Sequence, residues 1–164
     1  MGLGGVLMKT ISFFGHRVVF NRKEVRNKVL NFVVEKCVQG YKNFLIGSHG
    51  DFDGICLSAC IEVKKKFFTD VNIMVVLTGS PYIKKDEYGD SPFKRFEEIG
   101  VSTVFYDIEN VYYKNKILFS NKKMIDNSDL VLCYVDMDNI SSGARKAVKY
   151  AISLNKPIIN IFKN

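Results

Sequence analysis

The chain has 164 residues, of which 47% are hydrophobic and 25% charged, and its formal net charge is +7. These proportions exclude an intrinsically disordered protein, and no apolar run approaches the ~20 residues that a membrane-spanning helix needs. The length suits one domain with a single core, which we assign to residues 8–164, with residues 1–7 as an N-terminal extension.

All of the cysteines lie within apolar patterns, as expected of reduced, buried thiols in a cytoplasmic protein. They are Cys37, Cys56, Cys60 and Cys133. The N-terminus lacks the basic segment and cleavage site of a secretory signal, which also favours a cytoplasmic location. Cys56 and Cys60 are one helical turn apart, but no CxxC pair or histidine-rich stretch completes a metal site. We therefore expect neither a metal nor a cofactor.

The first half of the chain alternates strand and helix. Thr10–Phe14 is a short buried strand that ends at Gly15, and Asn21 is an acceptable N-cap for the helix that follows. The apolar residues of that helix recur at helical spacing: Val25, Val29, Phe32, Val33 and Cys37. Asn43–Ile46 is the second strand, and a second helix begins at Asp51. Its apolar stripe consists of Phe52, Cys56, Cys60, Val63 and Phe67.

The middle of the chain contains the clearest parallel strand, Val71–Leu77, which is apolar on both faces as a covered sheet requires. Residues 80–95 are polar and include Gly and Pro, so they are the best candidate for a mobile flap. We expect a short helix over Pro92–Ile99, a strand over Val101–Tyr106, and an irregular connection over residues 107–117.

The last part continues the alternation. A short helix around Met124 stops near Asn127, and Asp129–Val135 is a buried strand. Ser141–Gly143 opens the last helix, and Ile158–Phe162 is the final strand. Repeated β–α alternation with covered strands predicts an α/β fold: a three-layer Rossmann-like sandwich on a mainly parallel sheet.

In such sheets ligands bind beyond the carboxyl ends of the strands, near the switch point in strand order. Four polar loops follow strand ends here: Gly15–Arg17, Gly47–Asp51, Thr78–Ser80 and Asp136–Gly143. We expect the topology to bring at least the first, second and fourth loops together.

The Gly47–Asp51 loop lies between a strand and a helix start, an arrangement that aims backbone N–H groups and the positive end of a helix dipole at an anion. Gly47 and Gly50 permit close approach of a ligand, or simply form a tight turn. The loop is neither a Walker A motif nor GxGxxG. It nevertheless makes a phosphate-bearing small molecule the first ligand class to test.

Other residues of these loops have candidate roles. Arg17 offers a fork of donors that suits a phosphate or carboxylate, and His16 either binds a ligand, acts as acid or base, or is structural. One of Asp51 and Asp53 caps the helix, which leaves the other for a ribose hydroxyl. Ser141–Gly143 is either a second anion site or a simple N-cap.

The net charge of +7 raises the question of nucleic acid. The lysines, however, are spread over separate runs that usually form solvated faces: Lys64–Lys66, Lys84-Lys85, Lys122-Lys123 and the C-terminal tail. A positive field helps any phosphate-rich ligand to bind, so charge alone does not identify the partner.

Four segments occur in one order along nearly the whole chain from Thr10: Phe14–Arg17, Gly47–Asp53, Asn121–Asp129, and Ser142–Ala144 with Val148–Ala151. Together they resemble the SLOG superfamily of Rossmann-like proteins, and within it the YpsA-like branch. The superfamily includes the Lonely Guy (LOG) phosphoribohydrolases, the DNA-processing protein DprA, and sensor domains for signals such as cyclic ADP-ribose. The resemblance implies a nucleotide or ADP-ribose-like ligand.

The candidate ligand-binding residues come from these segments and from the strand-end loops. They are Gly15, His16, Arg17, Gly47, Ser48, His49, Gly50, Asp51, Phe52, Asp53, Asn121, Ser141, Ser142 and Gly143.

One departure from the LOG enzymes matters for function. Their PGGxGTxxE motif carries a glutamate that assists cleavage of an N-glycosidic bond, whereas Ser141–Ala147 has no acid and one glycine. Ser120 also stands where relatives commonly have Arg before Asn121. We therefore expect a cytoplasmic sensor or sequestering protein that binds a nucleotide-derived ligand, with dimerisation through a helix face permitted. The alternatives are a LOG-type hydrolase using Asp51, Asp53, Asp136 or His16, and a DprA-like DNA-binding protein.

Overall fold

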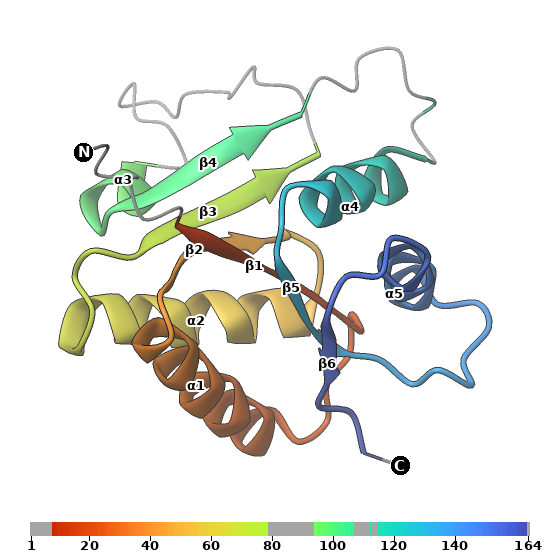
Figure 1. Cartoon of the computed structure of the whole chain (residues 1–164), viewed down its shortest axis with the longest axis horizontal. Helices are drawn as coiled ribbons and strands as arrows, with labels where there is room; N and C mark the ends of the chain where they lie inside the picture. Colours follow the sequence, from red (N-terminus) through yellow and green to blue (C-terminus); the bar gives the residue numbers. More distant parts are fainter. Residues whose placement is uncertain (1–7, 79–93, 107–111, 113–114, 164) are drawn as a thin grey trace, which may run out of the picture.

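The computed structural model describes residues 8–78, 94–106, 112 and 115–163. Over these residues the chain forms a six-stranded sheet with the order β4-β3-β2-β1-β5-β6, and every strand pairing is parallel. Helices cover the sheet on both sides (Figure 1). The predicted three-layer Rossmann-like sandwich is confirmed.

The strands are β1 (Lys9–Gly15), β2 (Tyr41–Ile46), β3 (Asn72–Leu77), β4 (Val101–Phe105), β5 (Leu130–Tyr134) and β6 (Ile158–Asn160). The helices are α1 (Arg22–Val38), α2 (Asp51–Lys66), α3 (Lys94–Glu98), α4 (Lys116–Asp126) and α5 (Gly143–Ser153).

The side chains of each central strand divide between two apolar cores, because successive residues point to opposite faces of a sheet. In β1, Ile11 and Phe13 pack in the core beneath α1 and α2, whereas Phe14 packs in the core beneath α4 and α5. Burial on both faces explains why the central strands read as continuous apolar runs.

The switch point of the sheet lies at β1. The chain builds β2, β3 and β4 on one side of β1, then crosses over to place β5 and β6 on the other side. The connections that leave β1 and β5 therefore diverge to opposite faces, and a crevice opens at the carboxyl ends of these two strands. His16 marks this point, because its N–H donates to the carbonyl of Tyr134 at the end of β5 (3.2 Å).

Several element boundaries differ from the sequence prediction, mostly by one or two residues; β2, for example, begins at Tyr41 rather than Asn43. Helix α4 begins at Lys116, inside the range predicted to be irregular. The sequence pattern did not reveal this start, because the polar Ser120 on the buried face interrupts the apolar stripe. Strand β6 ends at Asn160, whose side chain bonds the backbone N–H and C=O of Val135 (3.1 and 2.9 Å). Phe67 is 59% exposed because α2 ends one residue earlier.

Some expectations fall on residues outside the described part of the chain. These are the N-terminal extension over residues 1–7, residues 79 and 80 of the strand-end loop, and most of the proposed flap, residues 80–93, with the first two residues of the predicted short helix. Residues 107–111, 113 and 114 of the predicted irregular connection also lie outside that part of the chain. Residues 94 and 95 belong to α3. In the described residues, no helix combines the length and the apolar character that crossing a membrane requires.

Candidate functional site

A cavity of about 400 Å³ opens at the carboxyl edge of the sheet, beside the switch point. Its walls come from the ends of β1, β2 and β3, from the first turns of α2 and α5, from α4, and from the loop after β5. The lining residues are Phe13, Phe14, Gly15, His16, Arg17, Gly47, His49, Asp53, Val76, Thr78, Ile117, Ser120, Asn121, Met124, Asn139, Ser141, Ser142, Gly143 and Ala144. The three loops that were expected to meet do so.

The structure separates the candidate residues into two groups. Those that line the cavity come from all four predicted segments: Gly15, His16, Arg17, Gly47, His49, Asp53, Asn121, Ser141, Ser142 and Gly143. The others, Ser48, Gly50, Asp51 and Phe52, do not line it. Phe52 is fully buried and stacks on Tyr134, and Ser48 donates its hydroxyl to the Val76 carbonyl (3.0 Å).

Backbone hydrogen bonds join the β1–α1 loop to the start of α2. The N–H groups of Asp51 and Phe52 donate to the carbonyls of Arg17 (2.8 Å) and His16 (3.4 Å). The N–H of His49 donates to Asp53 Oδ2 (2.8 Å). Because these three N–H groups already have acceptors within the protein, they are not free to bind an anion. This differs from the arrangement expected at this helix start, in which backbone N–H groups point at an anion.

Gly50 is what allows the two loops to approach so closely. Its φ is +104°, and a Cβ at this position would lie 2.5 Å from Arg17 Cα. A side chain would therefore meet both an unfavourable backbone conformation and another backbone. The role of Gly50 is to join the two loops that form one wall of the cavity.

The two aspartates of this loop have different roles, which the sequence left open. Asp51 Oδ2 accepts from the Val19 N–H (3.0 Å) and pairs with Arg22 (2.9 Å), so it ties α2 to the β1–α1 loop. Asp53 instead lines the cavity and lies against Gly47, where a Cβ would stand 2.7 Å from its Oδ2. Gly47 thus makes room for the Asp53 carboxyl.

Asp53 has no cationic partner among the described residues. Burial raises the pKa of its carboxyl from 3.8 to about 7, against the opposing effect of the hydrogen bond from the His49 amide. A group of this kind accepts a hydrogen bond when charged and donates one when protonated, and both states are populated near neutral pH.

His49 lies beside Asp53, and its Nε2 is 2.7 Å from Thr78 Oγ1 at the end of β3. Burial lowers the pKa of its imidazole, and the nearby Arg17 lowers it further. The ring is therefore neutral at neutral pH and bridges two strand ends. Arg17 itself is exposed at the cavity, and its guanidinium has no bonding partner among the described residues.

His16 is held between β1 and the loop after β5. Its Nε2 accepts from the Asp136 N–H (2.7 Å), and its Nδ1 lies 3.4 Å from Ser142 Oγ. Its ring also makes edge contacts with Tyr134 and Phe162. Burial lowers the pKa of His16, partly opposed by the Asp136 carboxylate. These contacts favour the structural alternative for His16 over an acid/base role.

The start of α5 forms the part of the cavity best suited to an anion. Ser142 is the N-cap, and its Oγ accepts from the Arg145 N–H (3.2 Å). The amides of Gly143 and Ala144 belong to the first turn, where helix geometry supplies no carbonyl partner. Both residues line the cavity, so these donors and the helix dipole are present in its wall.

Helix α4 contributes a residue that sequence reasoning did not select. Ser120 is 1% exposed and lines the cavity, and its Oγ is the only buried side-chain oxygen or nitrogen without a partner in the described part of the chain. A buried hydroxyl without a partner is costly, and a bound ligand or water would satisfy it. Asn121 beside it also lines the cavity.

Over the described residues, no group of three or more His, Cys, Asp or Glu side chains is arranged to hold a metal ion. The four cysteines are free and buried within the apolar cores. The described polar groups of the cavity wall are therefore amides, hydroxyls, the imidazoles of His16 and His49, one guanidinium and one carboxyl.

Comparison of the sequence with models of known protein families gives no match, and neither does comparison with curated proteins.

Proposed function

We propose that this protein binds a nucleotide-derived ligand, of the ADP-ribose or cyclic-nucleotide kind, in the cavity at the carboxyl edge of its sheet. It would act as a sensor or sequestering protein for that ligand. The proposal rests mainly on one observation: a single cavity contains groups suited to phosphate and groups suited to a sugar. Free amide donors of α5 and the Arg17 guanidinium suit phosphate, whereas Asp53 and Ser120 suit the hydroxyls of a sugar.

The anion would lie at the start of α5. Two amides, the Ser142 hydroxyl and the positive end of an 11-residue helix are all found there. The Ser141 hydroxyl also lines the cavity, but it already donates to Asn139 Oδ1 (2.9 Å). Arg17 supplies the charge that a phosphate or pyrophosphate needs, as a fork of donors. These groups favour an anion site at α5 rather than at α2, because the N–H groups of Asp51 and Phe52 in α2 are already bonded.

The sugar would lie against the wall formed by α2 and α4. A charged Asp53 accepts hydrogen bonds from a pair of hydroxyls, and the buried Ser120 hydroxyl acquires a partner. The cavity volume of about 400 Å³ is within the range of about 300–1,000 Å³ usual for small-molecule sites. The resemblance of the sequence to the SLOG superfamily supports the same ligand class.

Thermal unfolding with a nucleotide panel tests this proposal. ADP-ribose, cyclic ADP-ribose, AMP and NAD are added separately at a large excess. A ligand at 100 times its Kd adds about 2.7 kcal/mol to the free energy of unfolding, which raises the Tm by roughly 5–10 °C. No shift with any member of the panel would contradict the proposal.

Two variants localise the effect. Arg17→Ala is expected to weaken binding by about tenfold, because it removes a charge-assisted contact to the anion. Lys146→Ala is the matched control, since it removes one positive charge from α5 at an exposed position that does not line the cavity. Equal losses for both variants would mean that only the general positive field matters.

Asp53 also gives specific support to a second candidate, hydrolysis of a nucleotide N-glycosidic bond. A carboxyl with a pKa of about 7 inside a ligand-sized cavity suits acid/base chemistry. Release of free base from AMP or NAD, abolished by Asp53→Asn while binding persists, would establish it. Binding of AMP or NAD without release of free base would exclude hydrolysis and support ligand binding alone.

A further inference from the structure

His16 makes contacts that define the protonation state of its ring. The Asp136 N–H donates to Nε2 at 2.7 Å, so Nε2 carries no proton. In the neutral imidazole the proton must then lie on Nδ1. Nδ1 faces Ser142 Oγ at 3.4 Å, and the hydrogen bond between them therefore runs from His16 to Ser142.

This direction determines what the Ser142 hydroxyl can do. A serine oxygen accepts two hydrogen bonds, and Ser142 Oγ already accepts from the Arg145 N–H (3.2 Å) and from the His16 ring. Its own O–H proton has no acceptor among the described residues, and Ser142 lines the cavity. The hydroxyl is thereby left as a hydrogen-bond donor only.

We propose that His16 is a positioning residue for the anion end of the cavity: it fixes the Ser142 hydroxyl as a donor that points toward a bound anion. This inference deepens the proposed function and rests on the anion end of that site. His16 need not touch the anion. It acts through Ser142, at the same helix start as the free amides of Gly143 and Ala144.

A second observation indicates that the cavity is built for a ligand. Ser120 Oγ, on α4, is buried without a partner and lines the same cavity. It comes from a different element than Ser142. The α5 start is therefore one wall of a cavity whose buried polar groups are not all satisfied by the protein itself.

A purely structural role for His16 predicts different consequences. In that case the bond from the Asp136 amide is what matters, because it ties β1 to the loop after β5. His16→Gln places an acceptor near the position of Nε2 and loses the donor at Nδ1. His16→Asn places a donor near Nδ1 and loses the acceptor. The two accounts therefore predict opposite rankings for this pair of variants.

Sulfate is the probe, because it tests the anion end without any assumption about the nucleotide. Binding is followed at neutral pH by the NMR shifts of the Gly143 and Ala144 amides. We expect His16→Gln and Ser142→Ala each to weaken sulfate binding by about tenfold, and His16→Asn to stay within about threefold of wild type. Ser142→Gly is a second variant that lacks the hydroxyl, with a smaller capping cost.

The double variant provides the decisive comparison. If His16 acts through the Ser142 hydroxyl, adding His16→Gln to Ser142→Ala causes no further loss, because the interacting pair is already broken. Additive losses, a stronger effect of His16→Asn than of His16→Gln, or ring nitrogen shifts showing the proton on Nε2 would each overturn the inference. So would the absence of amide shifts in wild type with sulfate.

The result also separates this inference from the proposed function. Sulfate binding with the expected variant pattern, but no binding of any nucleotide, would sustain the role of His16 and contradict the nucleotide ligand. Nucleotide binding with additive losses for the two variants would sustain the proposed function and overturn the role of His16.

Discussion

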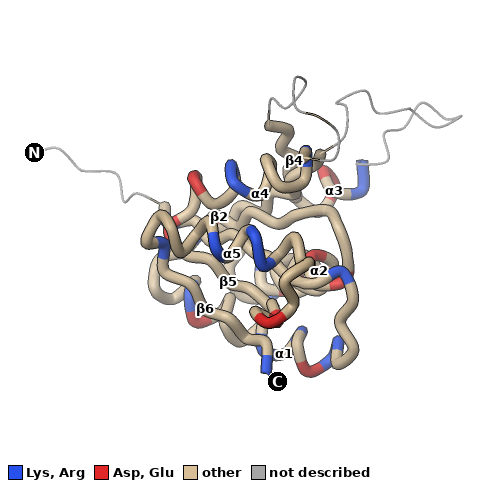
Figure 2. The backbone as a smooth tube through the Cα atoms, turned by 90° about the vertical axis from the view of Figure 1, so that its right-hand side faces the viewer, with Lys and Arg blue, Asp and Glu red and all other residues tan. Residues whose placement is uncertain are grey.

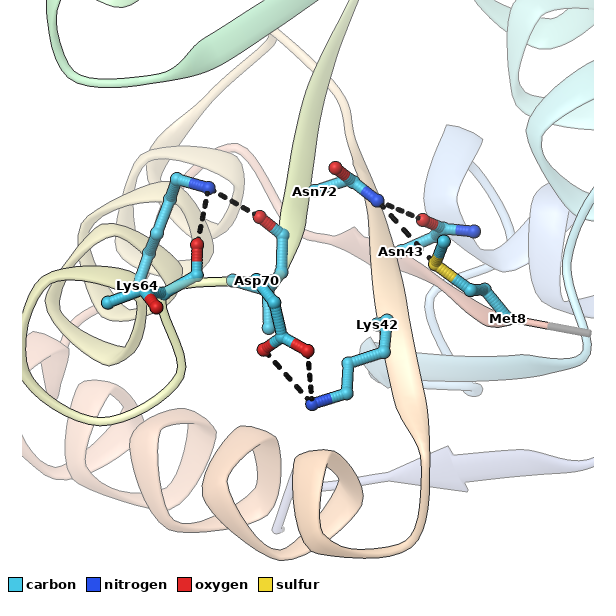
Figure 3. Close-up of polar contacts among 8 residues, drawn as sticks. Met8, Lys42, Asn43, Lys64, Asp70 and Asn72 are labelled. Carbon is cyan, nitrogen blue, oxygen red and sulfur yellow. Dashed lines mark hydrogen bonds and ion pairs between the residues drawn. The ribbon is translucent and has the colours of Figure 1, made fainter. Parts of the chain in front are cut away.

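The two edges of the sheet treat similar polar residues in opposite ways. At the amino edge, polar side chains bond one another and the backbone (Figure 3). Lys64 Nζ donates to the carbonyls of Thr69 (3.2 Å) and Val71 (2.6 Å), and Lys42 pairs with Asp70 (3.1 Å). These contacts supply partners from within the chain to the polar groups at the amino edge.

The carboxyl edge holds polar groups that the chain does not satisfy. Asp53 has no described cationic partner, Ser120 Oγ has no described partner of any kind, and the first amides of α5 have no helical acceptor. All of these residues line one cavity. The two edges therefore differ in how many hydrogen-bonding groups are left without a partner beside a cavity, rather than in polarity itself.

Charge alone does not show this difference. In Figure 2, Lys and Arg segments lie on several elements, with Asp and Glu segments among them. Some of the basic groups are also paired, as in the bonds of Arg26 and Lys66 to the same Glu62 (2.6 and 2.8 Å). In the described part of the chain, the basic residues therefore lie on several elements and do not mark the cavity.

Substitution of two glycines with positive φ should change the free energy of unfolding by very different amounts. Gly50 at the carboxyl edge and Gly40 at the amino edge have φ of +104° and +95°. A Cβ at Gly50 meets Arg17 Cα at 2.5 Å, whereas one at Gly40 has open space. Gly50→Ala should lower the free energy of unfolding by about 2–4 kcal/mol, and Gly40→Ala by about 1 kcal/mol. Denaturant unfolding measures both losses. Equal losses would show that the contact between Gly50 and Arg17 adds nothing to the cost of the backbone conformation.

Asp53 predicts a pH dependence of stability. Because its pKa is about 7 in the folded protein and ordinarily 3.8, the folded state binds the extra proton between these values. The free energy of unfolding should therefore fall as pH rises from about 4 to 7, by up to a few kcal/mol. Asp53→Asn should flatten this fall.

The matched control for that prediction is Asp70→Asn at the amino edge. It removes one partner of an exposed ion pair with Lys42, which is worth about 1 kcal/mol or less. Unfolding curves collected across this pH range should separate the two variants. If Asp53→Asn leaves the slope unchanged, the Asp53 carboxyl is solvated rather than buried in the cavity wall.

Substitution of two buried serines should change the free energy of unfolding by smaller amounts and in opposite directions. Ser12 Oγ donates to Ser128 Oγ (2.7 Å), so Ser12→Ala breaks a bond and should cost about 1 kcal/mol. Ser120 Oγ has no described partner, so Ser120→Ala should raise the free energy of unfolding by about 0.5–1 kcal/mol while weakening ligand binding. A loss of stability for Ser120→Ala would show that its hydroxyl is already satisfied.

The sequence was sufficient for the fold because the decisive signals are local. Apolar runs such as Val71–Leu77 and glycines at strand ends fix the alternation of strand and helix, and parallel topology then brings the strand-end loops together. This predicted the meeting of Gly15–Arg17 with Gly47–Asp51 and with the Asp136–Gly143 loop, which the cavity confirms.

Other features depend on partners far apart in the chain. The sequence could not show that the α2 amides bond the β1–α1 loop, or which of Asp51 and Asp53 faces the cavity. The tautomer of His16 depends on a backbone amide 120 residues away. Ser120 carries no motif at all; its role follows only from being buried without a partner.

An amide NMR titration with ADP-ribose shows directly whether the ligand binds at the carboxyl edge of the sheet. We expect saturable shifts at Gly143 and Ala144 in α5 and at Ser120 in α4, with Asn43 and Asn72 at the amino edge unchanged. No saturable shift, or shifts centred on the amino edge, would contradict it.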